Sequence, residues 1–71
     1  MEKHPDLIAL GENIRRLRKA ADMTQADLAG AAELSVNYVG ETERGERNPS
    51  FLKLVVIAKA LKVSPCVLFG S

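Results

Sequence analysis

The chain lacks most of the residues that support catalysis, metal binding or disulfide bonding. It contains one cysteine, Cys66, and one histidine, His4, so it can form neither an internal disulfide nor a cysteine-based zinc site. Its carboxylates are dispersed, so no group of acid, base and nucleophile suggests an enzyme. We therefore expect no catalytic residues, metal, cofactor or small-molecule ligand, and we expect Cys66 to be a small buried hydrophobe.

Long apolar runs are also missing. No stretch approaches the roughly 20 apolar residues of a membrane-spanning helix, and no charged-then-apolar signal segment opens the chain. The lone cysteine fits a reducing compartment. These absences predict a soluble cytoplasmic protein that has no membrane partner.

Aromatic residues and net charge are both low. At 4% aromatic content, the core must consist mainly of leucine, isoleucine, valine and alanine. A single core in 71 residues gives only a few kcal/mol of net stability, so a partner subunit would help. The formal net charge of +1 leaves nucleic-acid binding open, because such a binder must concentrate its positive charge on one face.

Apolar spacing and capping residues predict an all-α fold of five helices, in one domain over residues 1–71. Spacings of three and four over residues 6–21 predict the first helix, which Gly11 weakens by about 1 kcal/mol relative to alanine. The residues predicted to open the later helices are Thr24 with Asp27, Ser35, Ser50 before residues 51–61, and Ser64 with Pro65. The predicted core comprises Leu7, Leu10, Ile14, Leu17, Ala21, Leu28, Ala29, Ala32, Leu34, Val39, Leu54, Ile57, Ala58 and Leu61.

The predicted helix at residues 51–61 is apolar on nearly every side. Such a helix must be buried on both sides, and a chain of this size cannot cover both by itself. Surplus apolar surface of this kind usually marks an interface, so we expect a homodimer. The predicted dimer residues are Leu52, Val55, Val56, Val67 and Phe69.

Residues 24–44 form a predicted helix-turn-helix, which is two short helices joined by a tight turn. Each of these helices opens with polar residues, and the apolar residues recur where the two helices must pack. This geometry allows the second helix to enter the major groove of DNA. The sequence therefore predicts a DNA-binding protein whose main partner is a double-stranded operator.

With these residues identified, the chain resembles the lambda repressor and Cro-like family, also called the xenobiotic-response-element family. The resemblance covers about residues 10–69. The segment from Tyr38 through Glu43 to Ser50 is particularly similar to controller proteins of restriction–modification systems. This resemblance implies a compact lambda-repressor-like domain that acts as a dimeric repressor or activator of transcription on a palindromic operator. It also implies an autoregulatory controller as the more specific role, with RNA polymerase as a further candidate partner.

The resemblance also implies which residues read DNA bases. Asn37 would pair with adenine and Val36 would pack against a thymine methyl. For Tyr38, base contact and a core-edge position with its hydroxyl on a phosphate both remain open. Glu41 would accept a hydrogen bond from a cytosine amino group or would exclude wrong sequences by repulsion.

Other positions are expected to hold the DNA backbone or the fold. Gln25 would bind a phosphate and brace a polar residue of the recognition helix. Arg18 and Glu43 are expected to form a structural ion pair. The full set predicted to bind DNA is Thr24, Gln25, Ser35, Val36, Asn37, Tyr38, Glu41, Arg44, Arg47 and Asn48.

Two positions depart from the family pattern. Glu33 stands at a turn position usually held by a left-handed glycine, where another residue costs about 1 kcal/mol. Thr42 replaces a large apolar residue near the end of the recognition helix.

An alternative function is the antitoxin of a toxin–antitoxin pair, which would bind both operator DNA and a protein toxin. Such chains usually carry an added tail to wrap the toxin. The 71 residues leave little room for a tail, so we expect the regulator.

Overall fold

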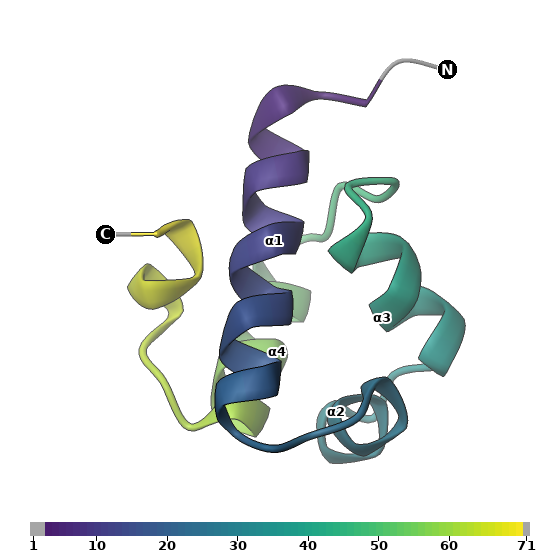
Figure 1. Ribbon diagram of the computed structural model, residues 1–71, viewed down its shortest axis with the longest axis vertical. Helices are drawn as coiled ribbons and strands as arrows, with labels where there is room; N and C mark the ends of the chain where they lie inside the picture. Colours follow the sequence, from purple (N-terminus) through teal and green to yellow (C-terminus); the bar gives the residue numbers. More distant parts are fainter. Residues whose placement is uncertain (1–2, 71) are drawn as a thin grey trace.

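Four α-helices and one 3₁₀ helix make up the computed structural model, which describes residues 3–70 (Figure 1). The all-α prediction is confirmed. The predicted domain of residues 1–71 includes residues 1–2 and 71, which lie outside the described residues. The elements are α1 (Pro5–Ala20), α2 (Gln25–Ala32), α3 (Val36–Glu43), α4 (Phe51–Leu61) and the 3₁₀ helix η1 (Pro65–Phe69).

The predicted fifth helix is present, but it is a 3₁₀ helix and not an α-helix. Ser64 caps the segment as expected, but Val67 N donates to Ser64 O at 3.0 Å, which is the shorter repeat of a 3₁₀ turn. Gly70, at φ 81°, ends the element after five residues. This short turn buries Leu68 and leaves Cys66 exposed, so the expectation of a buried cysteine is also wrong.

Side-chain caps define where the helices begin. The Thr24 hydroxyl accepts from Asp27 N while the Asp27 carboxylate accepts from Thr24 N, which completes the predicted capping box. The hydroxyls of Ser35 and Ser50 each accept a backbone N–H three residues further on. His4, to which the sequence assigned no role, caps α1 by accepting from Asp6 N at 3.1 Å.

Each element contributes a side chain to one shared core. The largest fully buried apolar side chains are those of Ile14, Leu28, Val39, Ile57 and Leu68, none more than 1% exposed and each from a different element. The predicted core is otherwise close to the observed one, except that Ala21 lies beyond the end of α1 and is exposed. Leu7, Leu17 and Leu34 are half-buried at the margin.

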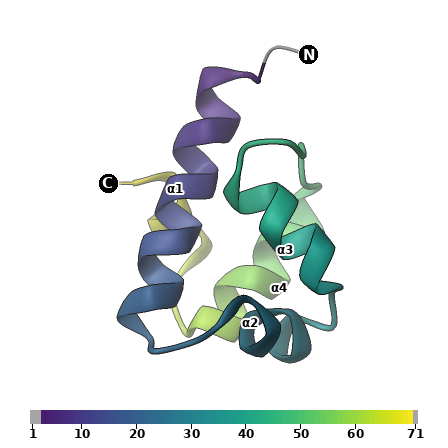
Figure 2. The same cartoon turned by 45° about the vertical axis from the view of Figure 1, so that its right-hand side comes forward.

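The helix-turn-helix consists of α2 and α3, with α3 packed along α1 and on the outside of the bundle (Figure 2). Glu33 in the turn between them adopts the predicted left-handed conformation, with φ 57°. Leu34 N then donates to Ala29 O at 2.8 Å, which turns the chain into α3. The backbone strain at Glu33 therefore belongs to the turn that sets the two helices against each other.

Gly11 determines how closely α1 and α3 approach. A Cβ at this position would overlap the backbone carbonyl groups of Thr42 and Glu43 at the end of α3. The glycine therefore fixes the seating of α3 on α1, although the sequence indicated only a weaker helix.

None of the helices within residues 3–70 has the length and apolar composition needed to cross a bilayer. In the same part of the chain, no three His, Cys, Asp or Glu side chains gather as metal ligands.

Candidate nucleic-acid interface

The buried and exposed sides of α3 differ sharply. Val39, Gly40, Thr42 and Glu43 are buried against the bundle. Val36 is 46% exposed and Asn37 is also exposed, at the N-terminal end of the helix. The helix therefore presents Val36 and Asn37, two of the side chains predicted to read bases, and uses its other side for packing.

Thr42, the second departure from the family pattern, fits its position without an apolar side chain. It is 2% exposed, and its hydroxyl donates to Tyr38 O at 2.7 Å within α3. This bond satisfies the buried hydroxyl, since an unpaired one would be costly.

A buried ion pair fixes the C-terminal end of α3 to α1. Arg18 Nε donates to Glu43 Oε2 at 2.6 Å, and Arg18 Nη2 donates to Glu43 Oε1 at 3.0 Å. The side chains are only 10% and 2% exposed. Arg18 also donates to Met23 O at 2.9 Å. The hydrogen bond to Glu43 raises the pKa of Arg18, so the guanidinium remains charged despite burial.

Gln25 connects this ion pair to the start of α2. Its Nε2 donates to Glu43 Oε1 at 3.1 Å, so the residue it braces is Glu43 at the end of α3. A Cβ at Gly40 would be in ordinary contact with Gln25 Oε1 at 3.6 Å and in tighter contact with Arg44 Nη1 at 3.1 Å. The side chains of Gln25 and Arg44 therefore both lie over this part of α3, and Thr24 is exposed at the N-terminal end of α2.

Tyr38 carries two cations on or near its ring. The Arg47 guanidinium carbon lies 4.8 Å from the ring centroid and Lys53 Nζ lies 5.9 Å from it, both within the range of cation–π attraction. Arg47 Nε also donates to Glu41 Oε1 at 2.9 Å. The structure therefore brings together three residues predicted to bind DNA and adds Lys53, which no local pattern had marked because it comes from α4.

Arg44 forms a second charge pair, and it lies close enough to Glu41 and Glu43 for their charges to act on it as well. Its Nε donates to Glu46 Oε2 at 3.1 Å, and the same oxygen lies 3.5 Å from Lys3 Nζ. The hydrogen bond from Arg44 lowers the pKa of Glu46 and raises that of Arg44. Sequence reasoning missed both Lys3 and Glu46, since the contact depends on the N-terminal segment lying beside the loop after α3.

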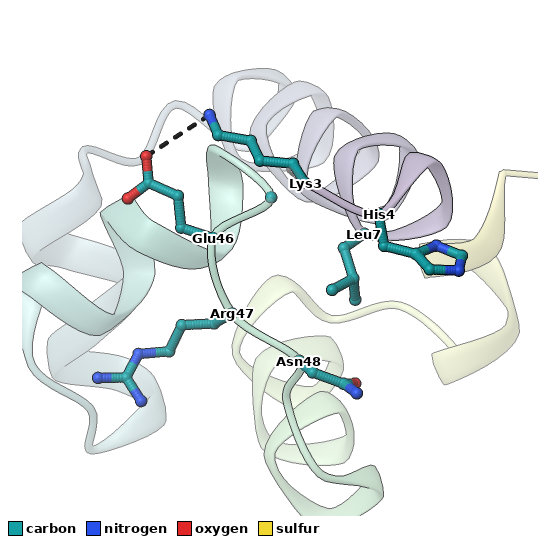
Figure 3. Close-up of a pocket in the computed structure, with 7 residues that line it drawn as sticks. Lys3, His4, Leu7, Glu46, Arg47 and Asn48 are labelled. Atoms are coloured by element: carbon teal, nitrogen blue, oxygen red, sulfur yellow. Dashed lines mark ion pairs between the residues drawn. The ribbon is translucent and has the colours of Figure 1, made fainter. Parts of the chain in front are cut away.

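A pocket lies between the N-terminal segment and this loop, lined by Lys3, His4, Leu7, Gly45, Glu46, Arg47 and Asn48. Figure 3 shows the ion pair between Lys3 and Glu46 at one side of it. Arg47 extends away from His4 and Leu7, whereas Asn48 points to a different side of the loop. The three residues after α3 that are predicted to hold the DNA backbone, Arg44, Arg47 and Asn48, are all exposed.

The residues predicted for the dimer differ in exposure. Leu52 is 72% and Phe69 is 63% exposed, whereas Val55, Val56 and Val67 are half-buried. Leu52 and Val56 line a shallow groove together with Leu34 from the turn. Phe51, which was not predicted, is 71% exposed at the start of α4.

Comparisons with known proteins agree with this geometry. The helix-turn-helix family model matches residues 14–68. Control protein C.SmaI of Serratia marcescens is 40% identical over 55 residues, which are 78% of this chain and 66% of that protein. The chain thus spans about two thirds of the length of that relative.

Two solved structures are similar over nearly the whole chain. The restriction-modification controller protein C.AhdI from Aeromonas hydrophila has a TM-score of 0.90 at 38% identity, covering 92% of this chain and 98% of that one. The controller protein C.Esp1396I, a tetramer in complex with its natural 35 base-pair operator, has a TM-score of 0.86 at 34% identity. That match covers 94% of this chain and 88% of that one.

Proposed function

The chain belongs to the helix-turn-helix family, and from this premise we propose that it is a dimeric, sequence-specific regulator of transcription. It reads a palindromic operator through the major groove. The observation that carries the proposal is the exposed N-terminal end of α3, where Val36 and Asn37 project from a helix that is otherwise seated in the bundle. A helix presented in this way can place side chains on base edges.

The base-reading role falls mainly on Asn37. An asparagine can form two hydrogen bonds with adenine, and Val36 can pack against a thymine methyl. Tyr38 is half-buried beneath Arg47, which favours a supporting position at the edge of the site over a deep base contact.

The backbone-binding role falls on residues around the ends of α2 and α3. Phosphate contacts fix orientation and register without reading sequence. Candidates on the protein side are Thr24, Gln25 and Ser35 at the helix starts, and Arg44, Arg47 and Asn48 after α3.

A more specific role, autoregulatory control of a restriction–modification system, is supported by the controller proteins among the similar sequences and structures. We assign the chain no catalytic activity. Its partner is a DNA operator, and RNA polymerase is a further candidate partner. We therefore propose that the protein acts in the cytoplasm.

The proposal is tested by selecting bound duplexes from a random pool and footprinting the DNA upstream of the chain's own gene. A palindromic consensus that also occurs upstream would support autoregulation. Asn37→Ala should cost about 1–3 kcal/mol on the selected site and relax preference at one base pair. Equal losses on selected and random DNA would remove Asn37 from the base-reading set.

Dimer formation is tested separately with Val56→Glu. A charge in the groove shared by Leu52 and Leu34 should oppose burial of that surface and give a folded monomer with weak operator binding. Analytical ultracentrifugation measures the change. A wild-type chain that stays monomeric at high micromolar concentration, with and without DNA, would rule out the dimer.

A further inference from the structure

Both arginines that follow α3 are paired with carboxylates of the same surface. Arg47 Nε lies 2.9 Å from Glu41 Oε1, and Arg44 Nε lies 3.1 Å from Glu46 Oε2. These are the distances of charge-assisted hydrogen bonds. The side chains are 36–56% exposed, so both pairs are open to solvent and to an approaching phosphate.

Each pair places a carboxylate in competition with DNA for a guanidinium. A phosphate that takes Arg47 must share it with Glu41 or displace that carboxylate, which is left close to the negatively charged backbone. Two arginines and two glutamates also make this group neutral overall, in a chain whose net charge is only +1.

The competition weakens phosphate contacts on random DNA and on the operator alike. Binding to random DNA depends essentially on phosphate contacts, whereas operator binding also gains from base contacts. A group that weakens phosphate contacts therefore lowers both affinities by a similar factor, and only the operator keeps base contacts that hold the protein.

We propose that Glu41 and Glu46 hold down affinity for non-operator DNA by competing with phosphates for Arg47 and Arg44. This proposal rests on the proposed function. Glu41 is the stronger competitor, because Arg47 is also held on the Tyr38 ring, within 4.8 Å of its centroid. Glu46 divides its charge between Arg44 and Lys3.

The first test measures binding of random-sequence duplexes by fluorescence anisotropy at low salt. Exposed ion pairs are worth up to about fivefold in an equilibrium, and removal of the carboxylate also relieves repulsion, so Glu41→Gln should bind about three- to tenfold more tightly. Operator affinity should rise by a similar factor, because the same phosphate contact is strengthened on both kinds of DNA. Glu46→Gln should change in the same direction by a smaller factor.

The matched control is Glu12→Gln, which makes the same change in net charge. Glu12 lies on α1 in a shallow groove with Arg15, Arg16 and Lys19, and neither arginine pair lines this groove. This variant should change random-DNA affinity less than twofold. An increase equal to that of Glu41→Gln would overturn the proposal, because net charge alone would then explain the effect.

The second test repeats Glu41→Gln in an Arg47→Gln background. Competition for Arg47 predicts that the gain disappears when the arginine is absent. The same gain in both backgrounds, no gain in either, or weaker binding by Glu41→Gln would each overturn the proposal. A wild-type chain that binds no DNA would instead refute the proposed function, so the two failures are distinguishable.

Discussion

Arginine–glutamate pairs occur in two contrasting regions of this molecule. In the contact between α1 and α3, Arg18 and Glu43 are 10% and 2% exposed, and Gln25 and Met23 O complete their hydrogen bonding. At the end of α3, Arg47 and Glu41 are 50% and 36% exposed and share one bond. The chemistry is the same, but burial makes the first pair part of the fold and leaves the second available for exchange with a ligand.

The difference follows from what replaces a lost partner. Water can solvate Arg47 or Glu41 at once if the other is removed. Around Arg18 and Glu43 the space is filled by the bundle, so removing one partner leaves a charge without compensation. The role of an arginine–glutamate pair therefore depends on its surroundings and not on its residue types.

The largest effect should come from breaking the buried pair. Glu43→Ala should lower the free energy of unfolding by about 3–5 kcal/mol, because Arg18 stays buried and Gln25 loses its acceptor. Urea denaturation measures this loss. Glu41→Ala is the matched exposed control and should change stability by less than about 1 kcal/mol. Similar losses for both variants would erase the contrast between the two regions.

The next effect concerns two glycines, Gly11 buried in the contact between α1 and α3 and Gly30 exposed on α2. Gly11→Ala should destabilise the fold by about 1–3 kcal/mol, since the new Cβ overlaps carbonyls of α3 and outweighs the gain in helix propensity. Gly30 has no atom within 4 Å of its ideal Cβ, so Gly30→Ala should stabilise by about 0.5–1 kcal/mol. Thermal melts of both variants show whether each substitution raises or lowers stability. A stabilising Gly11→Ala would mean that α1 and α3 are not held at this distance.

A smaller effect should appear when Arg47 is removed. Arg47→Ala should leave stability within about 1 kcal/mol of wild type and weaken binding to all DNA sequences similarly. The slope of log affinity against log salt concentration should become shallower by up to about one unit, because one phosphate contact is lost. Titrations across a salt series measure it. An unchanged slope would remove Arg47 from the backbone contacts.

The smallest effect is on pH dependence. Hydrogen bonds from the Thr24 backbone and hydroxyl lower the pKa of Asp27 in the folded state. Its stabilising contribution is therefore full above the pKa of the unfolded chain and is lost as pH falls through the lowered folded-state pKa. Asp27→Asn should flatten the loss of stability over that acidic window, although Glu46 still contributes in the same direction. Melting temperatures of wild type and Asp27→Asn, measured from neutral to acidic pH, would fall in parallel if the Asp27 carboxylate did not contribute to stability.

Local features were predicted well because they depend on neighbouring residues. The capping box of Thr24 and Asp27, the starts of α3 and α4, and the left-handed residue Glu33 all arise within one turn of chain. The pairing of Arg18 with Glu43 was anticipated from a family resemblance, although 25 residues separate them.

Contacts between distant segments were predicted poorly. The contact of Lys53 with Tyr38, the ion pair of Lys3 with Glu46, and the need for glycine at position 11 come from elements far apart in the chain. The type of the last helix also depended on where Gly70 ends it against the bundle.

By itself, therefore, the sequence determined that the chain folds as helices with caps and one apolar core, and that α3 opens with residues suited to base contact. The tertiary structure alone decided which charges are buried and which remain open to exchange. The physical reason is that periodicity and capping act over three or four residues, whereas burial and electrostatic environment depend on which segments the fold brings together.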